Sequence, residues 1–450
     1  MAIIGVVADD FTGTASAGVF VAKSQARTGL FFDAQSVENF QDADRLDAVY
    51  VSSNSRHLKP ETAYKEVAST TAALKKLGAR YFSKKIDTTL RGGIGTEIDA
   101  MLDLLGEDAI AVMVTAMPPS KRICVGGYSV IDGVVLTETS VAKDVKTPVT
   151  ECYVPDLIRK QTKQRVDFVP LNDVLKGTDH LKEVLQKSRM NGSRVIILDA
   201  ITMEHIDTIA KACVELKWNI LAVDPGPFTM KLAYHRNIIG EQISAVPEKT
   251  ERPRDKTVMI VAGSANPSTK AQMEYLCGQN PQCRVVSIAP AELIDGGEKA
   301  NKEVKRATSE IVGLFSSPEP PHVILIETAL HGVIVNLDQE DQRHQYETGA
   351  SSALINDGLA QITEHVLEAV GQKRVAGLML TGGDTMESVC RKIGVQCIQA
   401  LDNIVSQVDV GRIIGKYDGL PIVVKGGFCG YEGVGVDIVE RLFWESSREK

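Results

Sequence analysis

The sequence predicts an α/β protein made of two domains with largely parallel, buried sheets. Short apolar runs rich in Val and Ile alternate along the chain with stretches of helical periodicity. Strands that are buried on both faces have this continuous apolar character, and the helices between them supply the crossovers that parallel strands need. At 450 residues the chain is also too long for one ordinary core.

The expected elements follow one another as βα units. Strands are expected over residues 3–8, 48–52, 79–83, 110–115, 195–198, 220–223, 258–262, 323–327, 377–380 and 421–424. The clearest amphipathic helices are expected over residues 15–24, 61–77, 206–216, 268–277 and 436–443. In such an order the loops that follow the strands gather at one edge of each sheet.

The best boundary between the domains lies near residue 250. Residues 247–256 are charged, contain two prolines and precede a fresh apolar strand. This composition is typical of a linker. We therefore expect one domain over residues 1–248 and a second over residues 257–450.

Composition excludes several classes of function. A net charge of −8 argues against general affinity for nucleic acid. No apolar run reaches the roughly 18 residues of a membrane span, so no membrane partner is expected. The eight cysteines form no Cys-x-x-Cys pair, which predicts a reduced, cytoplasmic protein without structural zinc. A homo-oligomer is compatible with the sequence but is not indicated by any surface pattern.

The polar segment Lys84–Gly93 is the most informative stretch of the first half. It begins where the strand expected over residues 79–83 stops, and it ends in two glycines. Its side chains include three cations, one carboxylate and two hydroxyls, a set that suits a small anionic ligand rich in hydroxyl groups. A polar βα loop with a helix cap explains the same residues about equally well.

Two further strand ends of the first half carry polar groups. Asp9 and Asp10 follow the first strand, where paired carboxylates could bind sugar hydroxyls, hold a divalent ion or act as a base. Capping of the next helix by Asp10 or Thr12 accounts for only one of these groups. After residues 48–52 comes Arg56, whose guanidinium suits a carboxylate ligand, although a solvent-exposed loop arginine is equally consistent.

Three strands of the second half end in glycine turns, at Gly263, Gly382 and Gly426. Helix N-termini after such turns present free N–H groups and suit phosphate. At the second turn, Asp384 and Glu387 predict a capping box that starts the next helix. Neither a Walker motif nor a dinucleotide fingerprint is present, so a mononucleotide such as ATP fits best.

Taken in order, these motifs resemble those of the four-carbon acid sugar kinase family. The resembling segments are residues 8–13 (Ala-Asp-Asp-Phe-Thr-Gly), 84–92 (Lys-Lys-Ile-Asp-Thr-Thr-Leu-Arg-Gly), 116–122, 126–128, 147–149, 263–264, 381–385 (Thr-Gly-Gly-Asp-Thr) and 425–428 (Lys-Gly-Gly-Phe). The resemblance implies a two-domain kinase whose N-terminal domain binds the sugar acid and whose C-terminal domain binds ATP. The active site is then expected in the interdomain cleft.

The resemblance also implies the reaction, which is phosphorylation of the terminal 4-hydroxyl to give a 4-phospho acid. D-threonate is the first choice of substrate, with D-erythronate and 3-oxo-tetronate as alternatives. The segment 224–228 (Asp-Pro-Gly-Pro-Phe) looks more like the threonate-type branch. One departure is that the family often has an Asp soon after the opening Thr-Gly, where this chain has Thr14-Ala15-Ser16.

The resemblance and the expected mechanism together nominate site residues. The substrate contacts are Asp10, Arg56, Lys84, Lys85, Ile86, Asp87, Thr88 and Arg91, and the ATP contacts are Ser264, Gly382, Gly383, Asp384, Thr385 and Gly426. We expect Arg56 with Lys84 or Lys85 to clamp the substrate carboxylate, and Asp87 or Asp10 to orient or deprotonate the 4-hydroxyl. Arg91 and Lys425 would stabilise charge on the transferred group. Mg²⁺ would bridge the phosphates, and no residue is assigned as a metal ligand.

Two other classes of function are alternatives to a kinase. A sugar-acid dehydrogenase would need the dinucleotide fingerprint that this chain lacks. A non-catalytic sensor of sugar acids and ATP would bind both ligands without forming ADP.

Overall fold

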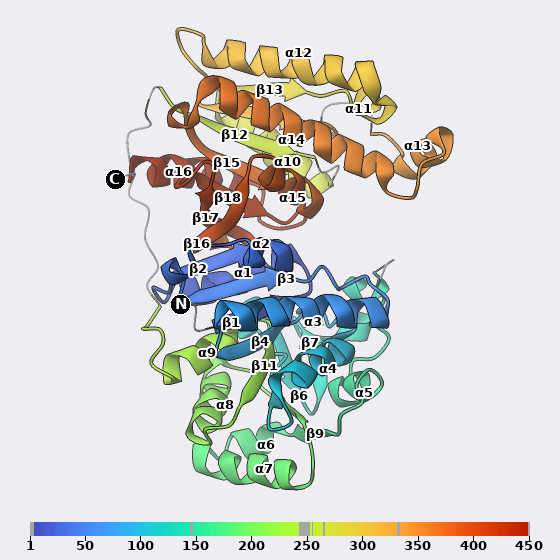
Figure 1. The fold of residues 1–450 in the computed structure, drawn as a ribbon, viewed down its shortest axis with the longest axis vertical. Helices are drawn as coiled ribbons and strands as arrows, with labels where there is room; N and C mark the ends of the chain where they lie inside the picture. The colour runs from blue at the N-terminus through green and yellow to red at the C-terminus, as the bar shows by residue number, and fades with distance from the viewer. Residues whose placement is uncertain are drawn as a thin grey trace. The chain divides into compact units, whose positions relative to one another are not determined.

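The computed structural model of the chain describes residues 4–144, 147–242, 253, 255–263, 266–330 and 334–448. It divides into two compact units, Met1–Ser244 and Ala245–Lys450 (Figure 1). The expected linker over residues 247–256 falls largely outside the described residues. No helix in the described ranges is both long and apolar enough to cross a membrane.

The first unit contains a parallel sheet flanked by helices, as the alternating pattern predicts. Its strands lie in the order β2-β3-β1-β4-β11-β5-β10-β9, and all neighbouring strands are parallel. The strands are β1 (Ile4–Ala8), β2 (Thr28–Phe31), β3 (Ala48–Ser52), β4 (Tyr81–Lys85), β5 (Ile110–Met113), β9 (Val166–Val169), β10 (Val195–Leu198) and β11 (Ile220–Asp224). The helices are α1 (Phe11–Ala22), α2 (Ala34–Glu38), α3 (Pro60–Leu77), α4 (Ile94–Leu105), α5 (Val154–Arg159), α6 (Leu171–Val174), α7 (Thr178–Met190), α8 (Met203–Glu215) and α9 (Pro227–His235). A small antiparallel sheet is added by β6 (Arg122–Val125), β7 (Tyr128–Ile131) and β8 (Val134–Val135).

The second unit also builds a sheet between helices. Its order is β13-β14-β12-β15-β18-β17-β16, with the first five strands parallel and the last two antiparallel to their neighbours. The strands are β12 (Thr257–Ala262), β13 (Cys283–Ser287), β14 (Val323–Glu327), β15 (Val375–Thr381), β16 (Val395–Val405), β17 (Val408–Gly415) and β18 (Pro421–Lys425). The helices are α10 (Pro267–Gln279), α11 (Pro290–Asp295), α12 (Gly297–Phe315), α13 (Leu337–His344), α14 (Ala350–Val370), α15 (Gly383–Lys392) and α16 (Val434–Ser447).

The two units share one strand order around their first strand. In each, the first strand lies between the third and the fourth, and the second lies beyond the third: β2-β3-β1-β4 in one unit and β13-β14-β12-β15 in the other. The chain therefore leaves the first strand toward one side of the sheet and leaves the fourth toward the other. Because parallel crossovers are right-handed, the two connections pass over opposite faces and open a crevice at the carboxyl edge.

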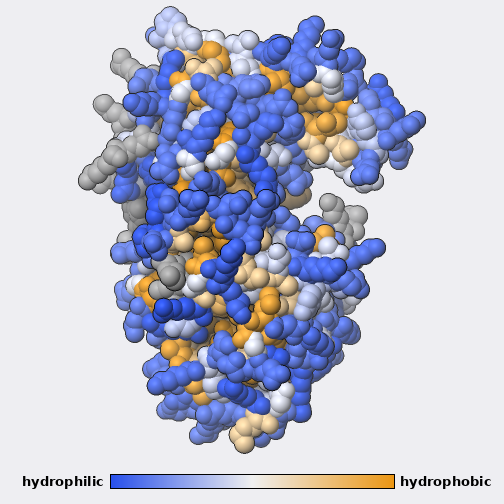
Figure 2. Space-filling model, in the orientation of Figure 1, coloured by the Kyte–Doolittle hydropathy of each residue, from blue (hydrophilic) through white to orange (hydrophobic). Residues whose placement is uncertain are grey.

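Each unit keeps its apolar side chains between the sheet and its helices. In the first unit, buried residues of β5, β10 and β11 pack against α7, α8 and α9. In the second, buried residues of β12, β15 and β18 pack against α10 and α16. Figure 2 shows hydrophilic residues over most of the face in view of each unit, with only scattered hydrophobic areas.

Several expected boundaries differ from the structure, and two of the differences lie at the candidate sites. β4 continues to Lys85 instead of stopping at residue 83, because both lysines pair with β1 on one side and with β11 on the other. α15 begins at Gly383, so Asp384 and Glu387 do not form the expected capping box. Gly382, with a φ of 97°, turns the chain before Asp384 is reached and is itself the N-cap. The sequence analysis also missed β2, β9, β13 and the antiparallel pair β16 and β17.

Candidate active site

Asp9 and Asp10 lie at the crevice between β1 and β4. All five residues of β1 are buried, and the chain turns into α1 directly after the two carboxylates. Asp10 is the N-cap of α1, and its Oδ1 accepts a hydrogen bond of 2.7 Å from the N–H of Gly13. The expectation that Asp10 caps this helix is confirmed, and its other oxygen remains available for a second partner.

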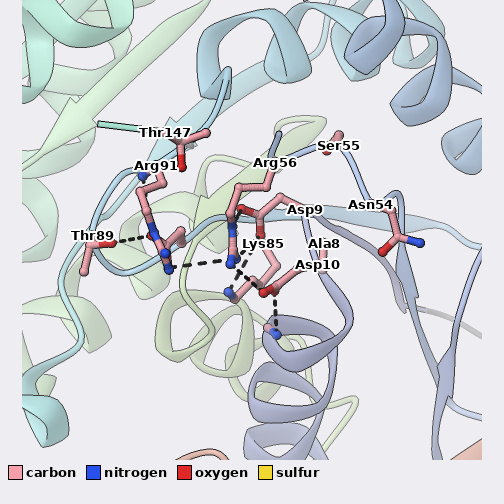
Figure 3. Close-up of polar contacts among 12 residues, drawn as sticks. Ala8, Asp9, Asp10, Asn54, Ser55, Arg56, Lys85, Thr89, Arg91 and Thr147 are labelled. Carbon is pink, nitrogen blue, oxygen red and sulfur yellow. Dashed lines mark hydrogen bonds and ion pairs between the residues drawn. The ribbon is translucent and has the colours of Figure 1, made fainter. Parts of the chain in front are cut away.

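Arg56 brings three carboxylates together (Figure 3). Its Nε and Nη2 donate to the two oxygens of Asp9 over 2.7 and 3.1 Å, and its Nη1 lies 2.5 Å from Oδ2 of Asp10. Its Nη2 also lies 3.9 Å from Oδ1 of Asp87. This guanidinium is thus already paired with carboxylates of the protein. Its observed role is to hold the carboxylates in place, and direct contact with a substrate carboxylate stays a prediction.

The two lysines at the end of β4 have different surroundings. Lys84 is fully buried: its Nζ lies 2.8 Å from Oε2 of Glu97 and donates to the carbonyls of Val7 and Lys85. Glu97 in turn accepts 2.7 Å from the hydroxyl of Ser55. All the donors of Lys84 are used inside the protein, so a substrate contact at this residue stays a prediction that requires the ammonium to leave one of these partners. Of the two lysines, Lys85 is the one that faces the crevice.

Lys85 lies against the first turn of α1. Its Nζ is 4.0 Å from Oδ1 of Asp9, too far for a hydrogen bond. A Cβ on Gly13 would collide with this Nζ and with Oδ1 of Asp10, so only glycine leaves room for the ammonium here. The positive end of the helix and the ammonium therefore lie together, an arrangement that favours a bound anion.

Asp87 and Arg91 form the other side of the crevice. Asp87 accepts from Nε and Nη2 of Arg91 over 2.7 and 3.2 Å and from the hydroxyl of Thr89. Nη1 of Arg91 donates 3.2 Å to Asp144, whose other oxygen accepts 2.8 Å from the N–H of Thr147. The expected segment thus folds back on itself, and Asp144, which is held by the N–H of Thr147, supports it.

The cations keep the buried carboxylates ionised. Burial raises the pKa of Asp87, but the hydrogen bonds of Arg91 and the charge of Arg56 outweigh it and leave the pKa below its usual range. At Asp9 burial also raises the pKa, but the charges of Arg56 and Lys85 lower it by more, so the pKa of Asp9 is below its usual range as well. Both groups are therefore weak proton acceptors. The side chain of Asp10 is 29% exposed against 9% for Asp87, so Asp10 is the better placed to accept a hydrogen bond from a ligand.

The remaining nominated residues of the first unit are less accessible. Ile86 is buried, and its N–H donates 3.1 Å to the carbonyl of Asp224. Thr88 is half-buried. Glu97 and Asp144 were not predicted, because they lie in the sequence outside the strand-end segments that drew attention to the site.

The second crevice, between β12 and β15, is lined by glycine turns. The N–H of Gly382 donates to the carbonyl of Lys425, and that of Gly426 donates to Gln407, so neither is directed at a ligand. The first N–H groups of α15 begin at Gly383 and have no partner inside the helix. Ser264 lies outside the described residues.

Thr385, which follows the turn at Gly382, packs against the turn at Gly263. Its buried hydroxyl donates 2.7 Å to Asn356, and a Cβ on Gly263 would collide with that hydroxyl. A contact between the side chain of Thr385 and ATP therefore stays a prediction, with its backbone N–H the better placed group. Asp384 follows the turn and is exposed.

The glycine turns of the second unit also offer a carboxylate for the Mg²⁺ that accompanies ATP. The described residues contain no group of three or more His, Cys, Asp or Glu side chains that could hold a metal ion. Mg²⁺ that travels on nucleotide phosphates keeps several waters and needs only one or two carboxylates. Asp384, at the first turn of α15, is the carboxylate that these turns offer, so the residues present fit such an ion.

A charged crevice in one α/β unit and glycine turns at helix N-termini in the other define a two-domain small-molecule kinase. Residues 4–232 match the family model of a sugar-binding N-terminal domain, and residues 259–434 match that of a nucleotide-binding C-terminal domain. The chain belongs to the four-carbon acid sugar kinase family and is a sugar-acid kinase. The predicted family resemblance is thereby confirmed.

Relatives of known activity cover the whole chain. The chain is 33% identical over 450 residues to the D-erythronate kinase of Heliobacterium modesticaldum, covering 100% of this chain and 99% of that one. It is 27% identical over 431 residues to the D-threonate kinase of Salmonella typhimurium, covering 94% and 95%. It is 26% identical over 436 residues to the 3-oxo-tetronate kinase of Brucella melitensis, covering 95% and 93%.

Solved structures confirm the α/β fold. A Haemophilus influenzae protein assigned to the family DUF1537 superposes with a TM-score of 0.73 at 20% identity, over 98% of this chain and 100% of that one. A protein of Salmonella typhimurium LT2 superposes with a TM-score of 0.78 at 19% identity, over 97% and 99%.

Proposed function

We propose that this kinase transfers the γ-phosphoryl group of ATP to the 4-hydroxyl of a four-carbon sugar acid, and that D-erythronate is the substrate to test first. The D-erythronate kinase of Heliobacterium modesticaldum is 33% identical over the full length, whereas the D-threonate kinase of Salmonella typhimurium is 27% identical. D-threonate, the first choice from the sequence, and 3-oxo-tetronate are the second candidates.

The observation that carries the proposal is that Nζ of Lys85 and Oδ1 of Asp10 both lie against Gly13, in the first turn of α1. An ammonium and helix N–H groups attract the carboxylate of a sugar acid. The carboxylate of Asp10 lies within the same turn, where a hydroxyl of the acid can donate to it. One small crevice thus offers both kinds of group that a sugar acid requires.

The other charged residues have positioning roles in this proposal. Phosphoryl transfer through a loose transition state demands little of a general base, so the lowered pKa of Asp87 is compatible with a carboxylate that orients the hydroxyl. Arg56 fixes the three carboxylates relative to one another. Arg91 is partly exposed and would offset charge on the transferred group.

ATP would bind at the glycine turns of the second unit. The N–H groups at Gly383 and Asp384, at the start of α15, would face its phosphates. Asp384 would hold the Mg²⁺ that arrives with ATP, and the ion would supply neutralisation of the phosphate charge. The expectation that transfer occurs in an interdomain cleft stays a prediction.

A substrate screen tests the proposal. The protein is mixed with ATP and, separately, with D-erythronate, D-threonate, L-threonate and a 3-oxo-tetronate, and ADP release is coupled to a spectrophotometric signal. We expect D-erythronate to give the highest kcat/KM and a 4-phosphorylated product detectable by phosphorus NMR. Binding of ATP and acid without ADP release would indicate a sensor instead. Reduction of a nicotinamide cofactor by the acid would indicate a dehydrogenase.

A further inference from the structure

Lys425, the last residue of β18, is a buried cation without a carboxylate partner in the described part of the chain. The residue is 1% exposed, and its Nζ donates to the carbonyls of Gly426 and Gly427 over 2.9 and 3.4 Å. Lys84 provides the contrast, because its buried ammonium lies 2.8 Å from Glu97. A buried ammonium that is left uncompensated is costly, which calls for a ligand that would compensate it.

An unsatisfied hydroxyl lies on the strand next to Lys425. Thr381, the last residue of β15, is in register with Lys425 on the neighbouring parallel strand, so both side chains stand on the same face of the sheet. The hydroxyl of Thr381 is buried and has no hydrogen-bond partner among the residues that the structure describes. Buried polar groups are normally paired, so this one also points to an absent partner.

The surrounding loop can release Lys425 without losing its shape. The carbonyl of Gly427 also accepts 2.9 Å from the hydroxyl of Thr269 on α10. The carbonyl of Cys429 accepts 3.1 Å from the side-chain amide of Gln272 on the same helix. The glycine loop after β18 is therefore held by α10 independently of the ammonium. Burial lowers the pKa of Lys425 to about 8, so most molecules still carry the charge at neutral pH.

We propose that Lys425 and Thr381 form a phosphate subsite of the nucleotide site. On nucleotide binding the ammonium exchanges the carbonyls of Gly426 and Gly427 for phosphate oxygens, and the hydroxyl of Thr381 donates to the same phosphate. Both side chains lie at the carboxyl edge of the sheet, directly before the turns at Gly382 and Gly426. This inference rests on the proposed function and adds two side-chain contacts to the backbone groups named there.

Nucleotide binding tests the subsite directly. Affinities for a non-hydrolysable ATP analogue, ADP and adenosine are measured by calorimetry for the wild type, Lys425→Met, Lys425→Arg and Thr381→Val. We expect Lys425→Met to bind the analogue about 10- to 100-fold more weakly, the range for loss of one charged hydrogen bond, with adenosine affinity unchanged. Lys425→Arg should retain part of the phosphate affinity, because it keeps the charge. Thr381→Val should show a smaller loss of the same kind.

A surface lysine of the same unit provides the matched control. Lys416 pairs with Glu368 in solvent, so Lys416→Met should leave every affinity unchanged. Lys425→Met removes a buried charge, and its thermal midpoint should not fall below that of the wild type. Wild-type analogue affinity in Lys425→Met, or an equal loss for adenosine, would refute the subsite alone. Failure of the wild type to bind any of the nucleotides would refute the proposed function and the subsite together.

Discussion

Replacement of Gly13 by alanine would separate activity from stability at the first crevice. Gly13 lies in the first turn of α1 with a backbone that alanine can adopt, so the substitution raises helix propensity by up to about 1 kcal/mol. The added Cβ would collide with Nζ of Lys85 and lie 2.5 Å from Oδ1 of Asp10. The end of a lysine side chain is flexible, so the ammonium should move away. The Asp10 carboxylate must also shift, which weakens the N-cap of α1 by about 1 kcal/mol and offsets the gain in helix propensity, so the free energy of unfolding should change little.

The size of the effect follows from the contact that would be lost. A hydrogen bond between an ammonium and a carboxylate contributes about 1.5–3 kcal/mol, so its loss lowers kcat/KM for the sugar acid about 10- to 150-fold. The KM for ATP should stay unchanged, because the glycine turns are not altered. Coupled ADP release gives the kinetic constants, and urea unfolding gives the free energy of unfolding.

Gly313 offers the matched control for this substitution. It lies in the last turn of α12, and a Cβ built there has no neighbouring atom within 4 Å. Gly313→Ala should therefore keep full activity. If Gly13→Ala kept the wild-type KM for the sugar acid, Lys85 would not be the group that binds the substrate carboxylate. If Gly13→Ala lost stability together with activity, the expectation that this substitution lowers activity without lowering the free energy of unfolding would be wrong.

Three further predictions concern the charged groups. Asp10→Asn keeps an oxygen that caps α1 but removes the negative charge. Turnover in the ADP assay should therefore fall at least about 100-fold, with little change in the urea midpoint. Normal turnover would exclude Asp10 from the reaction. Asp9 and Asp87 have pKa values below the ordinary 3.8, so the stability they contribute is present above that pH and is lost as the pH falls through their folded-state pKa values. The free energy of unfolding should thus drop below about pH 4 more steeply in the wild type than in Asp9→Asn, and parallel curves would contradict this reasoning. Finally, the pKa of Lys425 near 8 predicts that affinity for the ATP analogue falls as the pH rises from 7 to 9.5, whereas Lys425→Arg should show no such loss.

Strands built on a continuous apolar run were predictable to the residue. The bounds of β3, β10 and β14 match the expected ranges, because each contains an unbroken apolar run, which in β3 and β14 is followed by one polar residue at the strand end. The range expected for β4 ended too early, because the charged side chains of Lys84 and Lys85 are typical of a loop. Lys84 is acceptable inside the sheet only because Glu97, on the following helix, neutralises it. A local pattern cannot show such a partner.

The members of the charged crevice were predictable, but their pairing was not. Residues after parallel strands gather at one edge, so Asp10, Arg56 and Asp87 were expected together. That Arg56 is engaged by carboxylates of the protein depends on strand register and on the reach of its side chain. These properties arise only when the sheet is assembled. The expected role of Arg56 as a substrate clamp therefore rested on its charge and took no account of its neighbours.

The shared strand order of the two units explains where each site lies, whereas the side chains decide what it binds. Both units place a crevice beside their first strand, next to the fourth. In the first unit that crevice contains carboxylates such as Asp10, which are acceptors suited to sugar hydroxyls. In the second, the groups that a ligand can use are donors, namely the N–H groups that start α15 and the ammonium of Lys425, which donates to two loop carbonyls, and donors are what phosphate oxygens require. The same fold can thus hold the acceptor and the donor of a phosphoryl group, because one crevice supplies hydrogen-bond acceptors and the other supplies hydrogen-bond donors.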